Sequence, residues 1–412
     1  MTHPSTIAPP HVRKVRTKRG GEPSLARRLK GLGGAPAGRL RVTALALGLF
    51  LATRIATLIV VLVTASAVGR SPFRLLGRSW DSVWYMGIAV HGYGWRTTHY
   101  RPGITFSDYA FFPLYPGLVH AVCGVLPLSG GAAGLLISWT AAAAAAVGIF
   151  AVGTRLYGRG VGLTLVVLWG LLPHSVVLSM AYTEPVLTAF AAWSMYAVLS
   201  GRWIWAGALA TLAGISRPNG MAVFAAVVAG AAYEVWRVRR EGGHVPPRLW
   251  AGALLAPVGW CGYVAWVGYR RHDLLGGYFK VQSDWGSRFD FGAVSFVGRM
   301  LTHGERRFVF PMALLIVLIS VLLFGLLIVD RAPVALIVYS GVLLLVVLGG
   351  SGFFESKPRF LLPAFPLLLP IAQALARTAR ARPWHAVLVV GFLAGLSLSY
   401  GAYLIAFARA PL

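Results

Sequence analysis

The chain has 412 residues, of which 57% are hydrophobic and 12% are charged, and its mean hydropathy is +0.70. Soluble globular proteins carry roughly 25% charged residues, so this composition excludes a soluble protein and indicates a polytopic membrane protein. The 38 Lys and Arg residues far outnumber the 12 acids, but they lie between apolar runs and in the N-terminal segment. Topology and anionic lipid explain that placement better than nucleic acid does.

The first 41 residues are a basic segment with scattered Pro and Gly. They hold ten Lys and Arg residues against the single acid Glu22. This composition is typical of a disordered tail, and the apolar run that follows is too long for a cleavable signal. The positive-inside rule places residues 1–41 in the cytoplasm and leaves 42–412 as one transmembrane domain in the plasma membrane.

The first apolar run, 42–68, is long enough to cross a hydrocarbon core of roughly 30 Å, so the chain emerges outside near Arg70. The external segment 70–131 contains one apolar piece, 111–126. Its 16 residues, its prolines and the Pro127 that follows favour an interfacial or re-entrant helix over a span. If this piece does not cross, four later basic loops all fall in the cytoplasm. These loops contain Arg155 and Arg159, Arg202, four arginines within 237–248 and three within 377–382.

Ten further spans are expected, which makes about eleven in all and leaves the C-terminus outside. They are 132–153, 160–180, 184–200, 203–216, 219–235, 249–270, 308–329, 333–350, 359–376 and 384–408. Residues 203–216 are short for a span, so the break at 216–220 lies either within the membrane or at its edge. The main external loops are then 70–131 and 271–307. The sequence predicts an all-α polytopic fold without a separate soluble domain.

Four carboxylates remain on the external side once those in basic loops are set aside: Asp81, Asp108, Glu184 and Glu355. Asp108 precedes the apolar piece, where a helix cap is the expected role. Glu184 lies between two apolar spans, so capping a helix start and contacting a substrate are equal alternatives. Glu355 is expected to pair with nearby cations.

Two arginines, Arg217 and Arg359, stand at membrane depth or at its edge. An ionisable residue there is a functional hypothesis, and snorkelling to the interface is the competing interpretation, above all for Arg359. His91 and His174 have no second His or Cys at metal-binding spacing, so no metal site is expected. No cofactor is predicted, because no nucleotide-binding glycine loop follows a strand.

Residues 80–93 read W-D-S-V-W-Y-M-G-I-A-V-H-G-Y. As a helix, this segment puts Trp80, Trp84 and His91 on one face, with Asp81 one step round. Its rings suit a membrane interface and leave Asp81 facing water, so an interfacial helix with a solvated acid is the simplest interpretation.

Four blocks occur in a distinctive order. They are W-D-x(6)-I-A-x-H-G-Y at 80–93, F-F-P-L-Y-P at 111–116, A-Y-T-E-P at 181–185 and S-R-P-N-G at 216–220. In order and spacing, over residues 45–235, they resemble PIG-V, the second mannosyltransferase of glycosylphosphatidylinositol assembly, which has bacterial relatives. The C-terminal part matches only through K-P-R-F at Lys357–Phe360, the basic tail has no counterpart in the family, and 271–307 is not diagnostic.

The resemblance implies a GT-C glycosyltransferase that takes a sugar, usually mannose, from a polyprenyl phosphate on the extracytoplasmic side. It implies interfacial helices and a catalytic acid in the first external loop, where Asp81 falls. The matched residues that would line the same cavity are Tyr182, Glu184, Arg217, Asn219 and Arg359. Trp80, His91 and Tyr93 of the first block are expected to contact substrate. Because bacteria are not expected to make these anchors, a bacterial relative would use another lipid-linked or cell-envelope glycan as acceptor.

The chemistry is coherent with these residue types. Moving a sugar from a lipid phosphate to a hydroxyl needs a base for the acceptor proton and positive charge for the departing phosphate. Asp81 suits the base, and Arg217 or Arg359 suits the phosphate. The prediction is an inverting mannosyltransferase whose partners are a polyprenyl-phosphate sugar, a glycan or glycolipid acceptor and membrane lipids.

Two alternatives stay open. One is a GT-C enzyme for a different sugar, for instance glucose or arabinose. The other is a transporter or flippase of a lipid-linked sugar, which should show broken helices in both halves of the chain. The sequence shows a break only within 203–235, which counts against transport.

Overall fold

The computed structural model describes residues 36–101, 104–292 and 308–408. The chain divides into two compact units, Met1–Thr43 and Ala44–Leu412. In the first unit only the opening of helix α2 (Pro36–Ala67) is described, so most of the predicted basic tail lies outside the described residues. Part of the predicted loop 271–307 also lies outside them.

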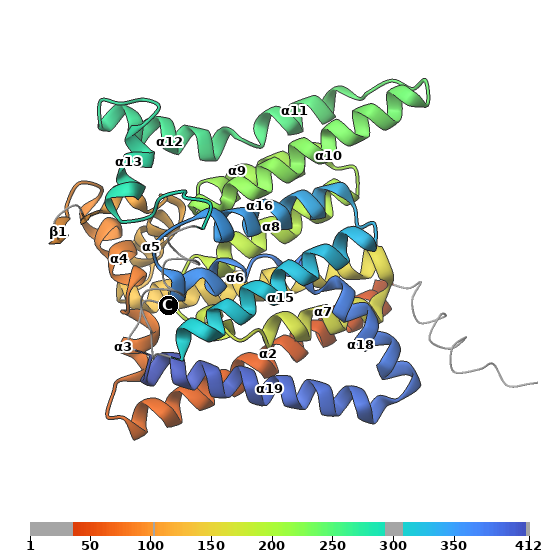
Figure 1. The fold of residues 1–412 in the computed structure, drawn as a ribbon, viewed down its shortest axis with the longest axis horizontal. Coiled ribbons are helices and arrows are strands. Elements are labelled where there is room, and N and C mark those ends of the chain that lie inside the picture. Colours follow the sequence, from red (N-terminus) through yellow and green to blue (C-terminus); the bar gives the residue numbers. More distant parts are fainter. Residues whose placement is uncertain (1–35, 102–103, 293–307, 409–412) are drawn as a thin grey trace, which may run out of the picture. The chain divides into compact units, whose positions relative to one another are not determined.

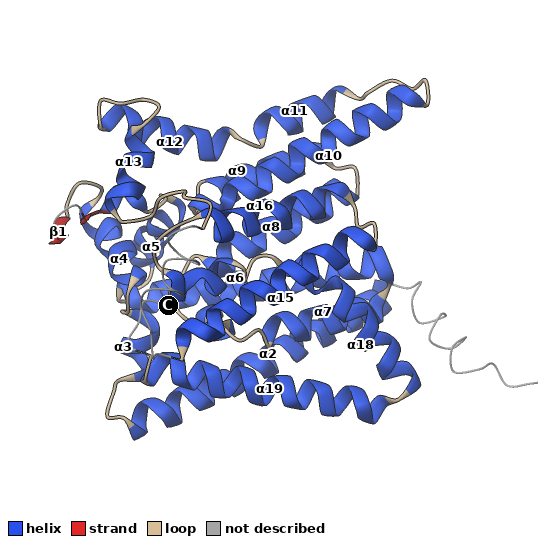
Figure 2. Cartoon of the chain, viewed as in Figure 1, coloured by secondary structure: helices blue, strands red, loops and turns tan. Residues whose placement is uncertain are grey.

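The second unit is built almost entirely of helices (Figure 2). Its two strands within the described residues, β1 (Thr97–Arg101) and β2 (Ile104–Ser107), pair antiparallel. The helices and 3₁₀ turns up to residue 170 are α3 (Pro72–Gly77), α4 (Asp81–His91), η1 (Asp108–Ala110), α5 (Leu114–Val125), α6 (Gly130–Tyr157) and α7 (Arg159–Gly170). Those from 175 to 284 are η2 (Ser175–Ser179), α8 (Glu184–Leu199), α9 (Trp203–Gly214), η3 (Pro218–Gly220), α10 (Met221–Arg240), α11 (Pro247–Leu255), α12 (Val258–Arg270) and α13 (Gly277–Asp284). The remainder are α15 (Val309–Val329), α16 (Val334–Gly349), η5 (Phe354–Ser356), α17 (Lys357–Phe360), η6 (Phe365–Leu368), α18 (Leu369–Ala381) and α19 (Pro383–Ala406).

Six helices of the described chain are long and apolar enough to cross a membrane. They are Gly38–Ala67, Gly130–Tyr157, Pro218–Arg240, Pro247–Arg270, Val309–Val329 and Pro383–Ala406. A seventh span is reached if the pair Phe354–Phe360 and Phe365–Ala381, bent by 77°, counts as one. Shorter apolar helices, among them α7, α9 and α16, lie at the other predicted spans. The predicted all-α polytopic membrane fold is confirmed.

The span predicted over 160–180 is interrupted. Helix α7 ends at Gly170, and the chain turns before it continues as the 3₁₀ turn η2. Pro173 explains the break, because proline lacks an N–H and disfavours the helical conformation of the residue before it.

The bend between Phe354–Phe360 and Phe365–Ala381, in the second half of the chain, was not predicted from the sequence. The predicted span 359–376 is in fact η5 and α17 followed by η6 and α18, with a 77° bend at the break. Proline again accounts for it, since Pro363 and Pro366 fall where a helix would have to continue. Breaks therefore occur in both halves of the chain, and the prediction of a break only within 203–235 is wrong.

The apolar piece 111–126 forms helix α5, which has 12 residues. At 1.5 Å per residue it is roughly 18 Å long, shorter than the hydrocarbon core, as a non-crossing helix requires. Helix α9 also has 12 residues and the same length argument applies to it. The break after α9 therefore suits a position within the membrane.

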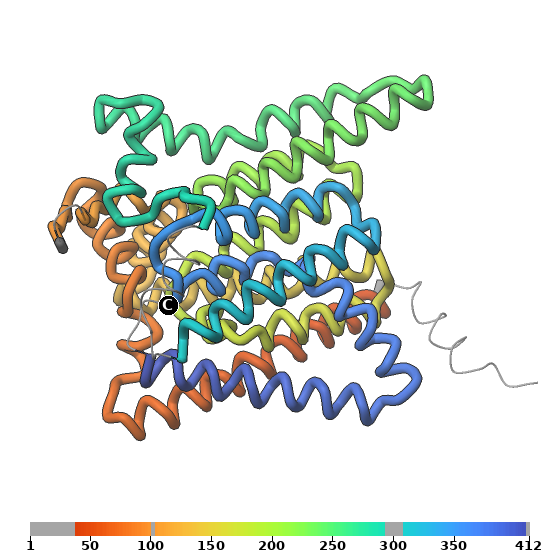
Figure 3. Tube along the Cα trace, in the orientation of Figure 1, coloured from red at the N-terminus to blue at the C-terminus, as the bar shows by residue number. Residues whose placement is uncertain are grey.

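The connections of the second unit lie at two opposite ends of its helices. Helices α3, α4, α5 and α13 and the β hairpin gather at one end (Figure 1). The turns α6–α7, α10–α11, α15–α16 and α18–α19 lie at the other, as the chain trace in Figure 3 also shows. The predicted basic loops fall at this second end, so one end of the helices is basic. We call it the basic end, and the other the α4 end.

Candidate active site

Four charged residues from distant parts of the chain meet at the α4 end. Asp81 opens α4 and Glu184 opens α8. Arg217 directly precedes η3, and Arg359 lies in the one-turn helix α17. Each is thus placed by a helix start or a short turn, where the chain changes direction.

The turn that carries Glu184 is fixed to its neighbours by hydrogen bonds. The Ser138 hydroxyl of α6 donates to the Tyr182 carbonyl at 2.8 Å and accepts from the Tyr182 N–H at 3.2 Å. The Tyr115 hydroxyl lies 2.8 Å from Ser138 Oγ, and the Ala181 N–H donates to the Leu76 carbonyl at 2.9 Å. The A-Y-T-E-P block is therefore held rigidly against α6 and α3.

The break that carries Arg217 depends on a close approach of two helices. A Cβ atom on Gly220 would collide with the backbone of Ala213 in α9, so only glycine fits there. Pro218 suits the first position of η3 because it needs no N–H partner. The S-R-P-N-G block thus folds tightly on the end of α9 and directs Arg217 inwards.

The two acids and two guanidiniums form a chain of ion pairs. Glu184 pairs with Arg217 Nη1, and its Oε1 lies 3.2 Å from Arg359 Nε. Arg359 Nη1 lies 2.9 Å from Asp81 Oδ2. The side chains of Glu184, Arg359 and Arg217 are 0%, 6% and 8% exposed, so one carboxylate and two guanidiniums are buried, and the partly exposed Asp81 supplies the second negative charge. This balance makes the burial of such groups tolerable.

A second layer of side chains holds the arginines in place. Arg217 Nη1 donates to Thr183 Oγ1 at 3.3 Å, and the Tyr85 hydroxyl lies 3.2 Å from the same atom. The Phe360 ring lies 5.1 Å from both the Arg217 and the Arg359 guanidinium carbons. Neither arginine snorkels towards an interface, the alternative considered from the sequence. Within the described residues, the Glu184 carboxylate makes no helix-capping hydrogen bond.

Two buried polar groups beside the arginines have no hydrogen-bond partner in the described part of the chain. One is the Tyr182 hydroxyl, whose ring lies 5.1 Å from the Arg359 guanidinium carbon. The other is Nδ2 of Asn219, in the turn after Arg217. Both can donate a hydrogen bond to a ligand without giving up an existing one.

Asp81 is the most exposed of the four charged residues in this cluster. Its side chain is 23% exposed, against 8% or less for the other three. Trp80, just before it, has φ of 53°, an uncommon conformation for a bulky residue, and its side chain is exposed. Backbone strain of this kind is concentrated at functional sites. The cluster therefore presents one accessible carboxylate backed by two buried guanidiniums.

Two of the predicted substrate contacts lie elsewhere. His91 and Tyr93 are at the other end of α4, roughly 15 Å along the helix from Asp81 at 1.5 Å per residue. The His91 ring lies 5.3 Å from that of Trp95, and the Tyr93 hydroxyl donates to the Phe111 carbonyl at 2.7 Å. In this structure they belong to an aromatic assembly beyond the ion-pair cluster.

Asp108 does not cap the helix that follows it, contrary to the sequence interpretation. Ser107 caps η1, and Asp108 Oδ2 instead accepts from the N–H groups of Gly94 and Trp95 at 2.7 and 3.1 Å. Burial raises the pKa of Asp108, while these N–H groups act in the opposite direction. Its role is to hold the loop after α4.

Three residues of the cluster were not singled out from the sequence: Tyr85, Thr183 and Phe360. All lie inside the quoted blocks or one helical turn from Asp81. Position in α4 is the signal for Tyr85, because residues four apart share a helix face. Thr183 and Phe360 are direct neighbours of Glu184 and Arg359.

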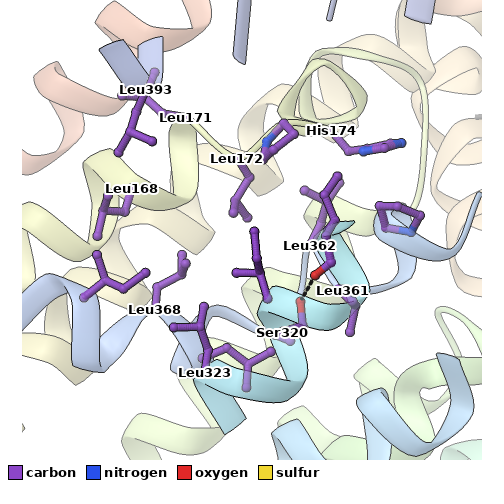
Figure 4. Close-up of a pocket in the computed structure, with 17 residues that line it drawn as sticks. Leu168, Leu171, Leu172, His174, Ser320, Leu323, Leu361, Leu362, Leu368 and Leu393 are labelled. Carbon is purple, nitrogen blue, oxygen red and sulfur yellow. Dashed lines mark hydrogen bonds between the residues drawn. The ribbon is translucent and has the colours of Figure 1, made fainter. Parts of the chain in front are cut away.

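An apolar cavity of about 220 Å³ lies beside the segment that carries Arg359. Its walls come from α7 and the turn after it, α15, α19, and the segment from Pro358 to Ile371. Figure 4 shows leucines on most sides of it, with His174 on the same side as Leu361 and Leu362. Pro358, Leu361 and Leu362 line the cavity, so residues on either side of Arg359 in the chain form part of its wall. Within the described residues, no three His, Cys, Asp or Glu side chains lie close enough to hold a metal ion.

No protein-family model and no curated protein matches the chain. It is similar to the solved structure of the Archaeoglobus fulgidus oligosaccharyltransferase in complex with zinc and sulfate, with a TM-score of 0.50 and 10% identity over 87% of this chain and 54% of that chain. The chain thus spans about half the length of that structure. It is also similar to ArnT from Cupriavidus metallidurans bound to undecaprenyl phosphate, with a TM-score of 0.49 and 13% identity over 87% of this chain and 76% of that chain.

The likeness to the oligosaccharyltransferase concerns the fold. It shows that the chain is a multi-pass membrane protein with the GT-C fold, as the sequence resemblance implied. At 10% identity it carries no information about donor, acceptor or site residues.

Proposed function

We propose that the chain is a GT-C glycosyltransferase that takes a sugar from a polyprenyl phosphate, with Asp81 as general base. The observation that carries the proposal is the accessible Asp81 carboxylate paired with buried Arg359 beside an apolar cavity. Transfer from a lipid phosphate needs these three parts: a base, positive charge for the phosphate and a place for an apolar chain.

The two guanidiniums supply the phosphate site. Arg217 and Arg359 are joined through Glu184, which is fully buried and orients both. Guanidinium groups bind carboxylate and phosphate with the same paired geometry, so a phosphate can take the place of a carboxylate on Arg359. Glu184, deep in the cluster, stays as the permanent partner, and the partly exposed Asp81 is the one replaced.

This exchange gives the reaction its order. Binding of the donor phosphate to Arg359 releases Asp81 from its ion pair, which leaves the carboxylate free to take the acceptor proton. The acceptor oxygen attacks the anomeric carbon as that carbon's bond to the phosphate oxygen breaks. The proton passes to Asp81, and the lipid phosphate leaves with an added negative charge that the arginines stabilise. A single displacement of this kind inverts the anomeric configuration.

The remaining features support the donor and the side of the membrane. The cavity beside Arg359 suits the first isoprene units of the lipid. The cluster is at the α4 end and the basic loops are at the other, which by the positive-inside rule supports a reaction on the extracytoplasmic face with the N-terminus in the cytoplasm. The resemblance to PIG-V favours mannose as the sugar and a lipid-linked or cell-envelope glycan as acceptor.

The test is transfer of radiolabelled mannose from polyprenyl-phosphate-mannose in membranes that contain equal amounts of each variant. We expect Asp81→Asn to lower transfer about 10²- to 10⁴-fold, the usual contribution of a general base, because Asn keeps the size but cannot take the proton. Asp273→Asn is the matched control. Asp273 is exposed in the loop between α12 and α13, where it accepts from the Gly276 N–H at 2.8 Å. Replacement of this carboxylate should leave transfer unchanged.

Each outcome selects one interpretation. Full transfer by Asp81→Asn would rule out Asp81 as the base. Transfer only from a donor with another sugar would keep the enzyme class and correct the sugar. Movement of the labelled lipid across the bilayer with no transfer from any donor would establish the flippase alternative.

A further inference from the structure

His174 is a buried imidazole without a hydrogen bond in the described chain. It is 1% exposed, and both Nδ1 and Nε2 lack a partner among the described residues. Buried polar atoms are rarely left unpaired, and each such case needs an explanation. The reaction proposed above makes no use of this residue.

Backbone carbonyls on both sides of His174 already have partners, so the imidazole is not needed to hold the break between α7 and η2. Arg54 of α2 donates to the carbonyls of Gly170 and Ser175 on the two sides of the break. Ser397 of α19 donates to the Leu172 carbonyl at 3.0 Å. These contacts fix the turn and leave the His174 ring free.

A second unpaired group lies beside the first. The Tyr400 ring of α19 meets the His174 ring edge to face, with 5.3 Å between their centres. The Tyr400 hydroxyl is also buried without a partner in the part of the chain that the structure describes. The two His174 nitrogens and the neighbouring Tyr400 hydroxyl can therefore all form hydrogen bonds that the described residues do not provide.

Of these two residues, His174 stands at the wall of the apolar cavity beside the segment that carries Arg359. His174 lines the cavity, and so do Pro358 and Leu361, which lie on either side of the Arg359–Phe360 pair. The other side chains around the cavity are apolar except Ser320, whose hydroxyl donates to the Ile316 carbonyl of its own helix at 2.8 Å. A ligand in this cavity would thus find His174 as the polar side chain with free capacity, at the boundary with Arg359.

We propose that His174 contacts the phosphate of the polyprenyl carrier where the apolar chain joins it, so that the lipid is held by the cavity, His174 and Arg359 together. This inference rests on the proposed function, and it names His174 as a binding residue for the donor. An imidazole can donate from one ring nitrogen to a phosphate oxygen. The other ring nitrogen keeps its capacity for a second hydrogen bond.

The test is binding of two lipids to the purified full-length protein in detergent. The probes are undecaprenyl phosphate and undecaprenol, which share the chain and differ in the phosphate. For His174→Phe, which keeps a ring against Tyr400, we expect undecaprenyl phosphate to bind about ten- to hundredfold more weakly and undecaprenol to bind as before. His174→Gln, which keeps a donor and an acceptor, should retain most of the affinity for the phosphate.

The matched control is Ser340→Ala. Ser340 of α16 is also fully buried with an unpaired hydroxyl in the described structure, but it does not line the cavity. Its loss should leave binding of both lipids unchanged. Thermal unfolding and gel filtration confirm that each variant is folded.

The results separate this inference from the proposed function. Equal binding of undecaprenyl phosphate by His174→Phe and the wild type, or an equal loss of both lipids, would overturn the role of His174. Specific loss of phosphate binding in a protein that transfers sugar from no prenyl donor would keep His174 and overturn the proposed reaction. No binding of undecaprenyl phosphate by the wild type would overturn both.

Discussion

Two arginines buried among apolar helices are stabilised in different ways. Arg54 of α2 is 7% exposed, and its partners are the carbonyls of Gly170 and Ser175, together with the Ser175 hydroxyl at 3.2 Å. The side chain of Arg359 of α17 is 6% exposed, and its ion-pair partners are the carboxylates of Asp81 and Glu184. Within the described residues, Arg54 makes no ion pair.

The difference distinguishes a structural arginine from a reactive one. The carbonyls that bind Arg54 belong to the backbone on the two sides of the break between α7 and η2, so no ligand can replace them without breaking the fold. The Gly170 carbonyl lies at the C-terminus of α7, where a positive charge is favoured. The carboxylates on Arg359 are side chains, and one of them is partly exposed. A phosphate can take the place of that carboxylate.

The largest effect on stability is expected from Glu184→Gln. The substitution leaves two buried guanidiniums with the single carboxylate of Asp81, and an uncompensated buried charge costs about 3–5 kcal/mol. The unfolding free energy in detergent should fall by that amount.

Glu234→Gln is the control for this loss. Glu234 also pairs with an arginine, Arg237, at 2.6 Å, but that pair is largely exposed. Its loss should change the unfolding free energy by no more than about 1 kcal/mol. If both variants were equally stable, Glu184 would not be the permanent partner of the two arginines.

Arg359→Lys is expected to act on transfer more than on stability. Lysine keeps the charge but loses the planar fork, and with it at least one charge-assisted hydrogen bond to the phosphate. A loss of about 1.5–3 kcal/mol corresponds to a fall of roughly 10- to 100-fold in kcat/KM for the polyprenyl-phosphate donor.

Arg380→Lys provides the comparison for this effect. Arg380 is exposed near the end of α18, on the basic end of the helices, and its replacement should leave kcat/KM unchanged. Unaltered kcat/KM in Arg359→Lys would mean that Arg359 only balances charge.

The sequence predicted the helices and the basic end better than the breaks within the helices. Apolar runs and arginine-rich loops are local signals, so they can be read along the chain. The break after α7 combines Pro173 with Arg54, which is 119 residues earlier in the sequence. A single arginine within the run 42–68 was a signal that could have been noted, since a charge at that depth is functional or specifically paired. Its partners could not be predicted, because they are backbone carbonyls of a distant turn.

In the site, too, the sequence predicted the local motifs but not the contacts between distant segments. The blocks at 80–93, 181–185 and 216–220 mark the residues that the structure brings together, yet spacing alone does not show which of them meet. Asp81 and His91 share the first block, but an 11-residue helix separates them. His174 was dismissed as a metal ligand from the sequence, and its unpaired nitrogens became visible only through burial.

The smallest effect is expected from Arg54→Lys, and it tests the comparison most directly. A lysine has one nitrogen at its tip, so it cannot reach the Gly170 and Ser175 carbonyls with the same fork, and at least one buried carbonyl loses its partner. The unfolding free energy should fall by about 1–3 kcal/mol. Transfer per folded molecule should be retained, because Arg54 does not touch the reacting atoms. A folded Arg54→Lys protein that loses as much transfer as Arg359→Lys would show that both arginines belong to one functional unit.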